Sequence, residues 1–149
     1  MNHRLFVLAL GNFAIGTEAF MIAGVLPALA QDLQVSLSSA GQLVTVFSLA
    51  YAIGSPVLAM FTGRVERRKL LVGSILLFAL ANFLCGFTNH YGLLVLGRVI
   101  AAIGAGLFVP AASTTAAGLV APEHRGKALA VVIGGQTVAL AAGVPLGTW

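Results

Sequence analysis

Five apolar stretches take up most of this 149-residue chain. A helix needs about 20 predominantly apolar residues to cross the hydrocarbon core of a bilayer. The stretches cover residues 5–30, 40–61, 70–88, 92–120 and 128–149, and the connectors between them are too short to hold a domain. We therefore predict an all-α fold for residues 1–149, a multi-pass bundle with five transmembrane helices.

The composition excludes a water-soluble protein. Charged residues make up 8% of the chain and apolar residues 59%, whereas a soluble domain carries about 25% charged residues. The net charge of +4 is not pooled on one polar face, so we expect no nucleic-acid partner. The single cysteine and three scattered histidines form no metal-ligand pattern, and no phosphate-binding loop or hydrolase motif is present. We expect no metal, no cofactor, no catalytic residue and no enzymatic activity.

The positive charges predict how the chain is oriented. Seven of the eight Lys and Arg residues precede the first stretch or lie in the second and fourth connectors: Arg4, Arg64, Arg67, Arg68, Lys69, Arg125 and Lys127. Because cytoplasmic loops are enriched in Lys and Arg, we predict a cytoplasmic N-terminus. The odd number of spans and the apolar end lead us to expect the N-terminal part of a longer protein, whose remaining helices are its partners.

Glu18 lies near the middle of the first stretch, within about 2 Å of the predicted midplane. A charge at that depth costs roughly 2.5–3.5 kcal/mol on insertion scales, so it normally faces a cavity or a partner. Removal from water favours the neutral form of a carboxyl group. We therefore predict that Glu18 carries protons or binds a cationic substrate. The alternative is a neutral glutamic acid hydrogen-bonded to a neighbouring helix.

Arg98 lies in the outer half of the fourth stretch. An arginine cannot discharge itself by losing its proton, so it needs an anionic group, backbone carbonyl groups or water. Glu18 is its candidate partner by type, at a depth that differs by about 5–10 Å. We predict that Arg98 faces a cavity, and the alternative is an arginine that extends to the outer headgroups.

Small residues recur every four positions in the fifth stretch, at Gly135, Ala139, Gly143 and Gly147. Such a stripe lets two helices approach closely. Pro145 lies within it, and a proline inside a helix bends the helix or removes a backbone hydrogen bond. We predict a helix contact along this stripe and a distortion near Pro145.

Four motifs follow one another along the chain: GTEAFMIAGVLPALAQDLQVS, AGQLVTVFSLAYAIGSPVLA, LLVLGRVIAAIGAG and GGQTVALAAGVPLG. Their order and spacing resemble the N-terminal helices of the major facilitator superfamily. The resemblance is to its bacterial twelve-helix drug–proton antiporter branch, which also contains sugar and purine efflux proteins. It places Glu18 at the intramembrane acid of that branch and Arg98 at the arginine implicated in proton coupling. The antiporter motif of the fifth helix matches at Gly134, Gly143, Pro145 and Gly147.

The second connector resembles the loop signature of the superfamily, GxxxDRxGRR. The basic positions match at Arg64, Arg67 and Arg68. Ala59 replaces the first glycine, Gly63 the acid and Glu66 the second glycine. These departures weaken the expectation that the loop acts as an interdomain gating clamp.

The resemblance implies a transporter with two six-helix halves around a midplane cavity. Its function would be proton-coupled efflux of small molecules, such as drugs or antibiotics, across the bacterial inner membrane. Its partners would be a small-molecule substrate, protons and the lipid bilayer. Two alternatives stay open. The first is efflux of sugars or purine nucleosides, and the second is a non-transporting scaffold subunit that binds partner helices.

Overall fold

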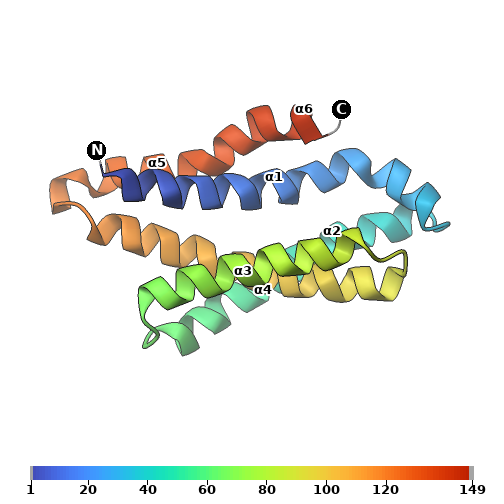
Figure 1. Cartoon of the computed structure of the whole chain (residues 1–149), viewed down its shortest axis with the longest axis horizontal. Helices are drawn as coiled ribbons and strands as arrows, with labels where there is room; N and C mark the ends of the chain where they lie inside the picture. Colours follow the sequence, from blue (N-terminus) through green and yellow to red (C-terminus); the bar gives the residue numbers. More distant parts are fainter. Residues whose placement is uncertain (1, 148–149) are drawn as a thin grey trace. The chain divides into compact units, whose positions relative to one another are not determined.

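A computed structural model describes residues 2–147, and Figure 1 shows the order of the helices along the chain. Within this range the chain is helical and contains no strand, which confirms the predicted fold class. Four helices of the described part are long and apolar enough to cross a membrane: α1 (His3–Asp32), α2 (Leu37–Thr62), α3 (Arg67–Gly86) and α4 (Tyr91–Gly118).

The fifth apolar stretch forms three helical segments in place of one helix. A short 3₁₀ turn (Pro122–His124) leads into α5 (Arg125–Val138), which continues as a π-helical turn (Ala139–Gly143) and then as α6 (Val144–Gly147). The π-helical turn includes residue 141, whose carbonyl group the ring of Pro145 would meet in a regular α-helix. The expected distortion is therefore present just before the proline. Residues 148–149 of the predicted span lie outside the described residues.

The helices begin before the apolar stretches that predict them, and α3 and α4 each end two residues before the end of their stretch. α2 begins at Leu37 because Ser36 caps it, with Oγ accepting a hydrogen bond from the N–H of Ser39 at 3.1 Å. α3 begins at Arg67, so its first turn contains three basic residues of the second connector. Hydropathy marks the part of a helix that lies in the bilayer, whereas caps and polar helix-forming residues decide where the helix ends.

The contacts divide the chain into two compact units, and α1 and α4 each contribute to both. One unit contains residues 1–24 and 109–149, and the other contains residues 25–108. We call them the 1–24/109–149 unit and the 25–108 unit and describe each by itself.

In the 25–108 unit, α2 and α4 run in the same direction and meet at three levels. Tyr91 donates from Oη to the carbonyl oxygen of Ser39 at 2.7 Å. Ser55 donates from Oγ to the carbonyl oxygen of Gly106 at 3.0 Å. Between these hydrogen bonds the guanidinium of Arg98 lies over the ring of Phe47. The α2 residues at the three levels are eight positions apart, or about 12 Å along a helix.

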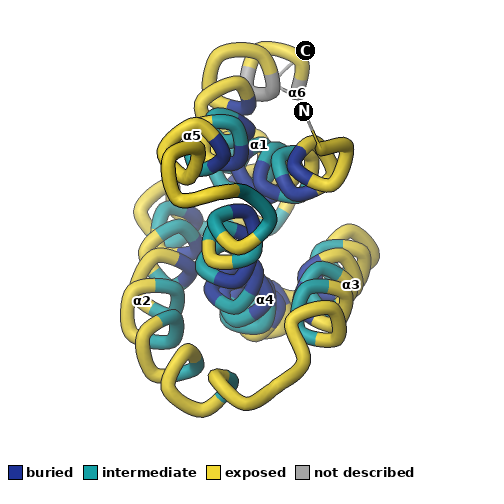
Figure 2. Tube along the Cα trace, turned by 90° about the vertical axis from the view of Figure 1, so that its left-hand side faces the viewer, coloured by how far each residue is buried: buried dark blue, intermediate teal, exposed yellow. Residues whose placement is uncertain are grey.

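The opposite side of α4 packs against α3 through glycines. A Cβ atom at Gly104 would lie 2.9 Å from both the main-chain nitrogen of Phe78 and the carbonyl oxygen of Ser74. A Cβ atom at Gly97 would overlap Sγ of Cys85. Figure 2 shows the buried side of α4 between α2 and α3. Close approach of this kind is typical of helix pairs in membranes, where small residues allow backbones to touch.

In the 1–24/109–149 unit, α1 and α5 lie side by side and run in the same direction (Figure 1). A Cβ atom at Gly135 would overlap the carbonyl oxygen of Ala9. One turn further along α5, Cβ of Ala139 would lie 3.0 Å from a Cβ atom at Gly16. The first two members of the predicted small-residue stripe therefore form the contact with α1. Parallel packing is expected for two helices that begin on the same side of a membrane.

Candidate functional site

Arg98 is buried on α4, with 4% of its surface exposed. Its Cζ atom lies 4.4 Å from the centroid of the Phe47 ring, well within the distance of about 6 Å at which a cation is attracted to an aromatic face. An arginine that extends to the headgroups would be exposed. The structure therefore places this guanidinium inside the helix packing, and its functional role stays a prediction.

The aromatic partner of Arg98 is a residue that the sequence analysis missed. Phe47 is itself 8% exposed, and its ring stacks against that of Tyr51, with centroids 6.3 Å apart and an interplanar angle of 16°. We expected an anion, backbone carbonyl groups or water beside Arg98, and the ring was not among these candidates. Phe47 lies in an apolar motif, where no pattern marks one of the nine phenylalanines as the partner of a cation.

Glu18 lies on α1 in the 1–24/109–149 unit and is half-buried. Its Oε2 atom is shielded from solvent. Ala9, which touches α5, is nine residues before Glu18, so the two lie on opposite sides of α1 at 3.6 residues per turn. Glu18 is therefore directed away from the contact between α1 and α5. Arg98 belongs to the other unit, and the pairing of the two charges stays a prediction.

Two further polar side chains on α1 have buried polar atoms. Asn12 is 0% exposed and donates from Nδ2 to the carbonyl oxygen of Val132 on α5 at 2.9 Å. Within residues 2–147, no hydrogen-bond partner is found for Oδ1 of Asn12 or for Oγ1 of Thr17. Sequence reasoning missed both residues because it considered only side chains that carry a full charge. The sequence does mark Asn12 as costly to bury, because it is an amide side chain within an apolar run.

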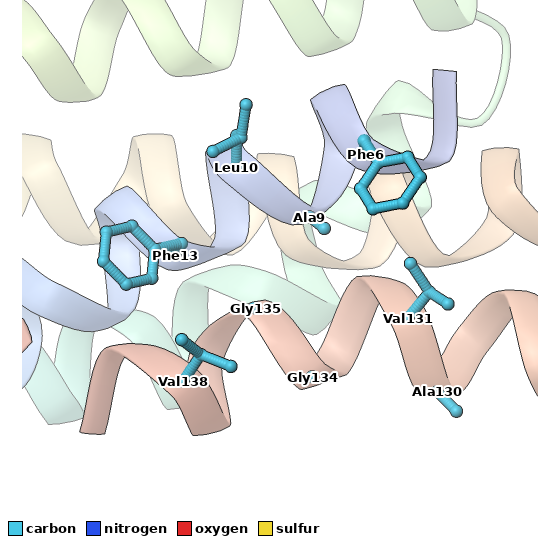
Figure 3. A pocket seen from close by; sticks show the side chains of 9 residues that line it. All are labelled: Phe6, Ala9, Leu10, Phe13, Ala130, Val131, Gly134, Gly135 and Val138. Carbon is cyan, nitrogen blue, oxygen red and sulfur yellow. The ribbon is translucent and has the colours of Figure 1, made fainter. Parts of the chain in front are cut away.

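An apolar groove of about 320 Å³ lies between α1 and α5 (Figure 3). Its lining is Phe6, Ala9, Leu10, Phe13, Ala130, Val131, Gly134, Gly135 and Val138. Small-molecule sites combine apolar walls with a few polar groups that orient the ligand. The lining of this groove offers no polar side chain, so the groove has no means of orienting a polar substrate.

The antiporter-motif glycines differ in their surroundings. A Cβ atom at Gly134 would have no neighbour within 4 Å in the described structure, whereas its neighbour Gly135 touches α1. Pro145 lies in α6, and Gly143 and Gly147 have helical backbones at the end of the π-helical turn and in α6. Of these motif positions, Gly134 lines the apolar groove.

The basic loop-signature residues are all exposed: Arg64, Arg67 and Arg68. Glu66 and Lys69 form an ion pair at 3.2 Å across one turn at the start of α3. Cations in the first turn of a helix oppose the helix dipole, so Arg67 and Arg68 do not stabilise α3 by this effect. Their placement agrees with a role in fixing topology.

Among the described residues, no group of three or more His, Cys, Asp or Glu side chains could hold a metal ion. Long apolar helices, close glycine contacts and large apolar side chains on the surface, such as Phe61 with 78% exposed, define a multi-pass α-helical membrane protein.

The chain belongs to the major facilitator superfamily, whose sequence profile matches residues 8–149. It is 42% identical to a chloramphenicol resistance protein of Streptomyces lividans, over 97% of this chain and 38% of that protein. It is 40% identical to the uncharacterized MFS-type transporter YbcL of Bacillus subtilis, over 97% of this chain and 37% of that protein. It is 32% identical to the inner membrane transport protein YdhP of Escherichia coli, over 100% of this chain and 38% of that protein. The chain thus spans less than two fifths of the length of these relatives.

Proposed function

We propose that the complete protein is a proton-coupled efflux transporter, which exports small molecules such as antibiotics across the bacterial inner membrane with its N-terminus in the cytoplasm. The observation that carries the proposal is the buried guanidinium of Arg98, held in the packing of a transporter-family helix. An ionisable group at such a position is usually functional, because it is costly to insert. The similarity to a chloramphenicol resistance protein supports an antibiotic as substrate.

In this proposal Glu18 exchanges a proton for substrate, and the positive charge of Arg98 biases that exchange. Glu18 is suited to the role because its carboxyl group is half-buried and faces away from α5. A proton that moves inward down its gradient would then drive the substrate out. The remaining helices of the complete protein would supply the other half of the cavity.

The test is proton release from the complete protein in membrane vesicles, measured on addition of chloramphenicol. We expect Glu18→Gln to abolish this release, because glutamine keeps the shape of the side chain but carries no exchangeable carboxyl proton. The matched control is Glu66→Gln, since Glu66 is an exposed acid paired with Lys69 outside the apolar stretches. Normal release from Glu18→Gln would overturn the assigned role of Glu18.

The same vesicles separate the alternatives. Release on addition of a purine nucleoside or a neutral sugar, without release on addition of chloramphenicol, would assign the protein to sugar or nucleoside efflux. A scaffold subunit predicts no substrate-driven release from the complete protein and normal function of Glu18→Gln.

A further inference from the structure

The contact between Arg98 and Phe47 joins two side chains that are both nearly excluded from solvent, with 4% and 8% of their surfaces exposed. The guanidinium carbon lies 4.4 Å from the centre of the ring. A charge at such a site has lost most of its hydration, and the negative face of an aromatic ring offers partial compensation.

We propose that Phe47 is a positioning residue for Arg98: its ring attracts the guanidinium and holds it between α2 and α4. An arginine in the outer half of a span has another low-energy arrangement, in which the side chain extends along the helix to the headgroups. The ring favours the buried arrangement over the extended one. Arginine suits this role better than lysine, because its planar and weakly hydrated guanidinium stacks on aromatic faces.

The position of the ring is itself fixed by its surroundings. Tyr51 lies one turn further along α2 and stacks on Phe47. The hydrogen bond from Tyr91 to Ser39 lies on one side of the contact, and the bond from Ser55 to Gly106 lies on the other. These two bonds set the register of α2 against α4, so that Phe47 and Arg98 stay level with each other.

A consequence follows for transport, and it rests on the proposed function. If the charge of Arg98 biases proton exchange, its effect depends on where the guanidinium is held. Weakening the attraction of the ring, without changing its shape, should then lower substrate-driven proton release.

The experiment replaces Phe47 in the complete protein by phenylalanines with one, two or three ring fluorines, which progressively weaken the negative face of the ring at nearly constant size. We expect the Tm to fall with each added fluorine. The rate of chloramphenicol-driven proton release should fall in parallel, by about tenfold for the trifluorinated ring. In an Arg98→Met background the Tm series should be flat, because the cation is absent.

Two other phenylalanines serve as controls for fluorination. Phe78 on α3 is 6% exposed and packs near Gly104, and Phe61 on α2 is largely exposed. The same substitutions there should leave both readouts unchanged.

A flat Tm series at position 47, or an equal fall in the Arg98→Met background, would overturn the proposed contact. A graded Tm with unchanged proton release would overturn the positioning role and leave only a structural one. Failure of the unsubstituted protein to release protons would count against the proposed function, and the Tm series would still decide whether Phe47 holds Arg98.

Discussion

The side-chain amide of Asn12 donates a hydrogen bond to the carbonyl oxygen of Val132 and joins α1 to α5 across 120 residues of sequence. The bond lies within the seam where the two backbones approach each other. Gly135 touches Ala9 and Gly16 touches Ala139 in the same seam. A polar link is thus enclosed by small residues, in the manner of helix pairs that associate without a hydrophobic driving force.

Replacement of Asn12 by leucine should destabilise the complete protein only modestly, by less than about 1 kcal/mol. Interhelical hydrogen bonds in membrane proteins are worth about 0.6 kcal/mol on average and at most about 1.7 kcal/mol. Leucine also removes a buried Oδ1 atom that has no hydrogen-bond partner within residues 2–147, which offsets part of the loss. The free energy of unfolding in a denaturing detergent measures this effect.

Asn82→Leu is the matched control for Asn12→Leu. Asn82 donates from Nδ2 to the carbonyl oxygen of Phe78 at 2.9 Å, within α3 itself. Loss of this hydrogen bond breaks no link between helices, so Asn82→Leu should change the free energy of unfolding less than Asn12→Leu does. An equal effect at the two positions would mean that the link between α1 and α5 contributes nothing specific.

Adjacent glycines on α5 should respond differently to alanine. A Cβ atom at Gly135 would overlap the Ala9 carbonyl oxygen, so Gly135→Ala should cost about 1–3 kcal/mol through overpacking. Among residues 2–147 no atom lies within 4 Å of the Cβ position of Gly134, so Gly134→Ala should be neutral or slightly stabilising, because alanine favours the helix by up to about 1 kcal/mol. The fraction of complete protein that stays monodisperse after heating measures the effect of each substitution on stability. Equal losses would contradict this assignment of the contact glycine.

The sequence predicts the helical class and the order of the first four helices, because a run of about 20 apolar residues is typical of a helix that crosses a membrane. The ends of the helices are predicted less well. α2 begins three residues before its apolar stretch, since Ser36 caps it, and α3 begins within the basic connector at Arg67. In the fifth stretch Pro145 predicts a distortion nearby but not its form, because the π-helical turn over residues 139–143 depends on how the backbone adjusts before the proline.

Residues that are costly to bury could be identified from the sequence, but their contacts could not. Arg98 stands out as a charge in an apolar stretch, whereas its partner Phe47 lies 51 positions earlier and depends on the register of α2 against α4. The small-residue stripe, in contrast, contains Gly135 and not its neighbour Gly134. A rotation of about 100° per residue places only Gly135 against α1.

The orientation in the membrane can be tested with single cysteines. In a Cys85→Ala background of the complete protein, Gln34→Cys and Val65→Cys place thiols at exposed positions in the first and second connectors. Because positive charges favour the cytoplasmic side, an impermeant maleimide should label position 34 in intact cells and position 65 only after permeabilisation. The reverse pattern would place the N-terminus outside.

Arg98→Lys keeps the positive charge but replaces the planar guanidinium by a compact, strongly hydrated ammonium group. Since the Phe47 ring faces the guanidinium at 4.4 Å, we expect this substitution to lower the Tm and to reduce substrate-driven proton release about tenfold. Arg125→Lys is the control, because Arg125 is exposed in the first turn of α5 and a surface substitution there should change stability by less than about 0.5 kcal/mol. Normal stability and release with lysine at position 98 would mean that charge alone suffices and that the shape of the guanidinium is not recognised.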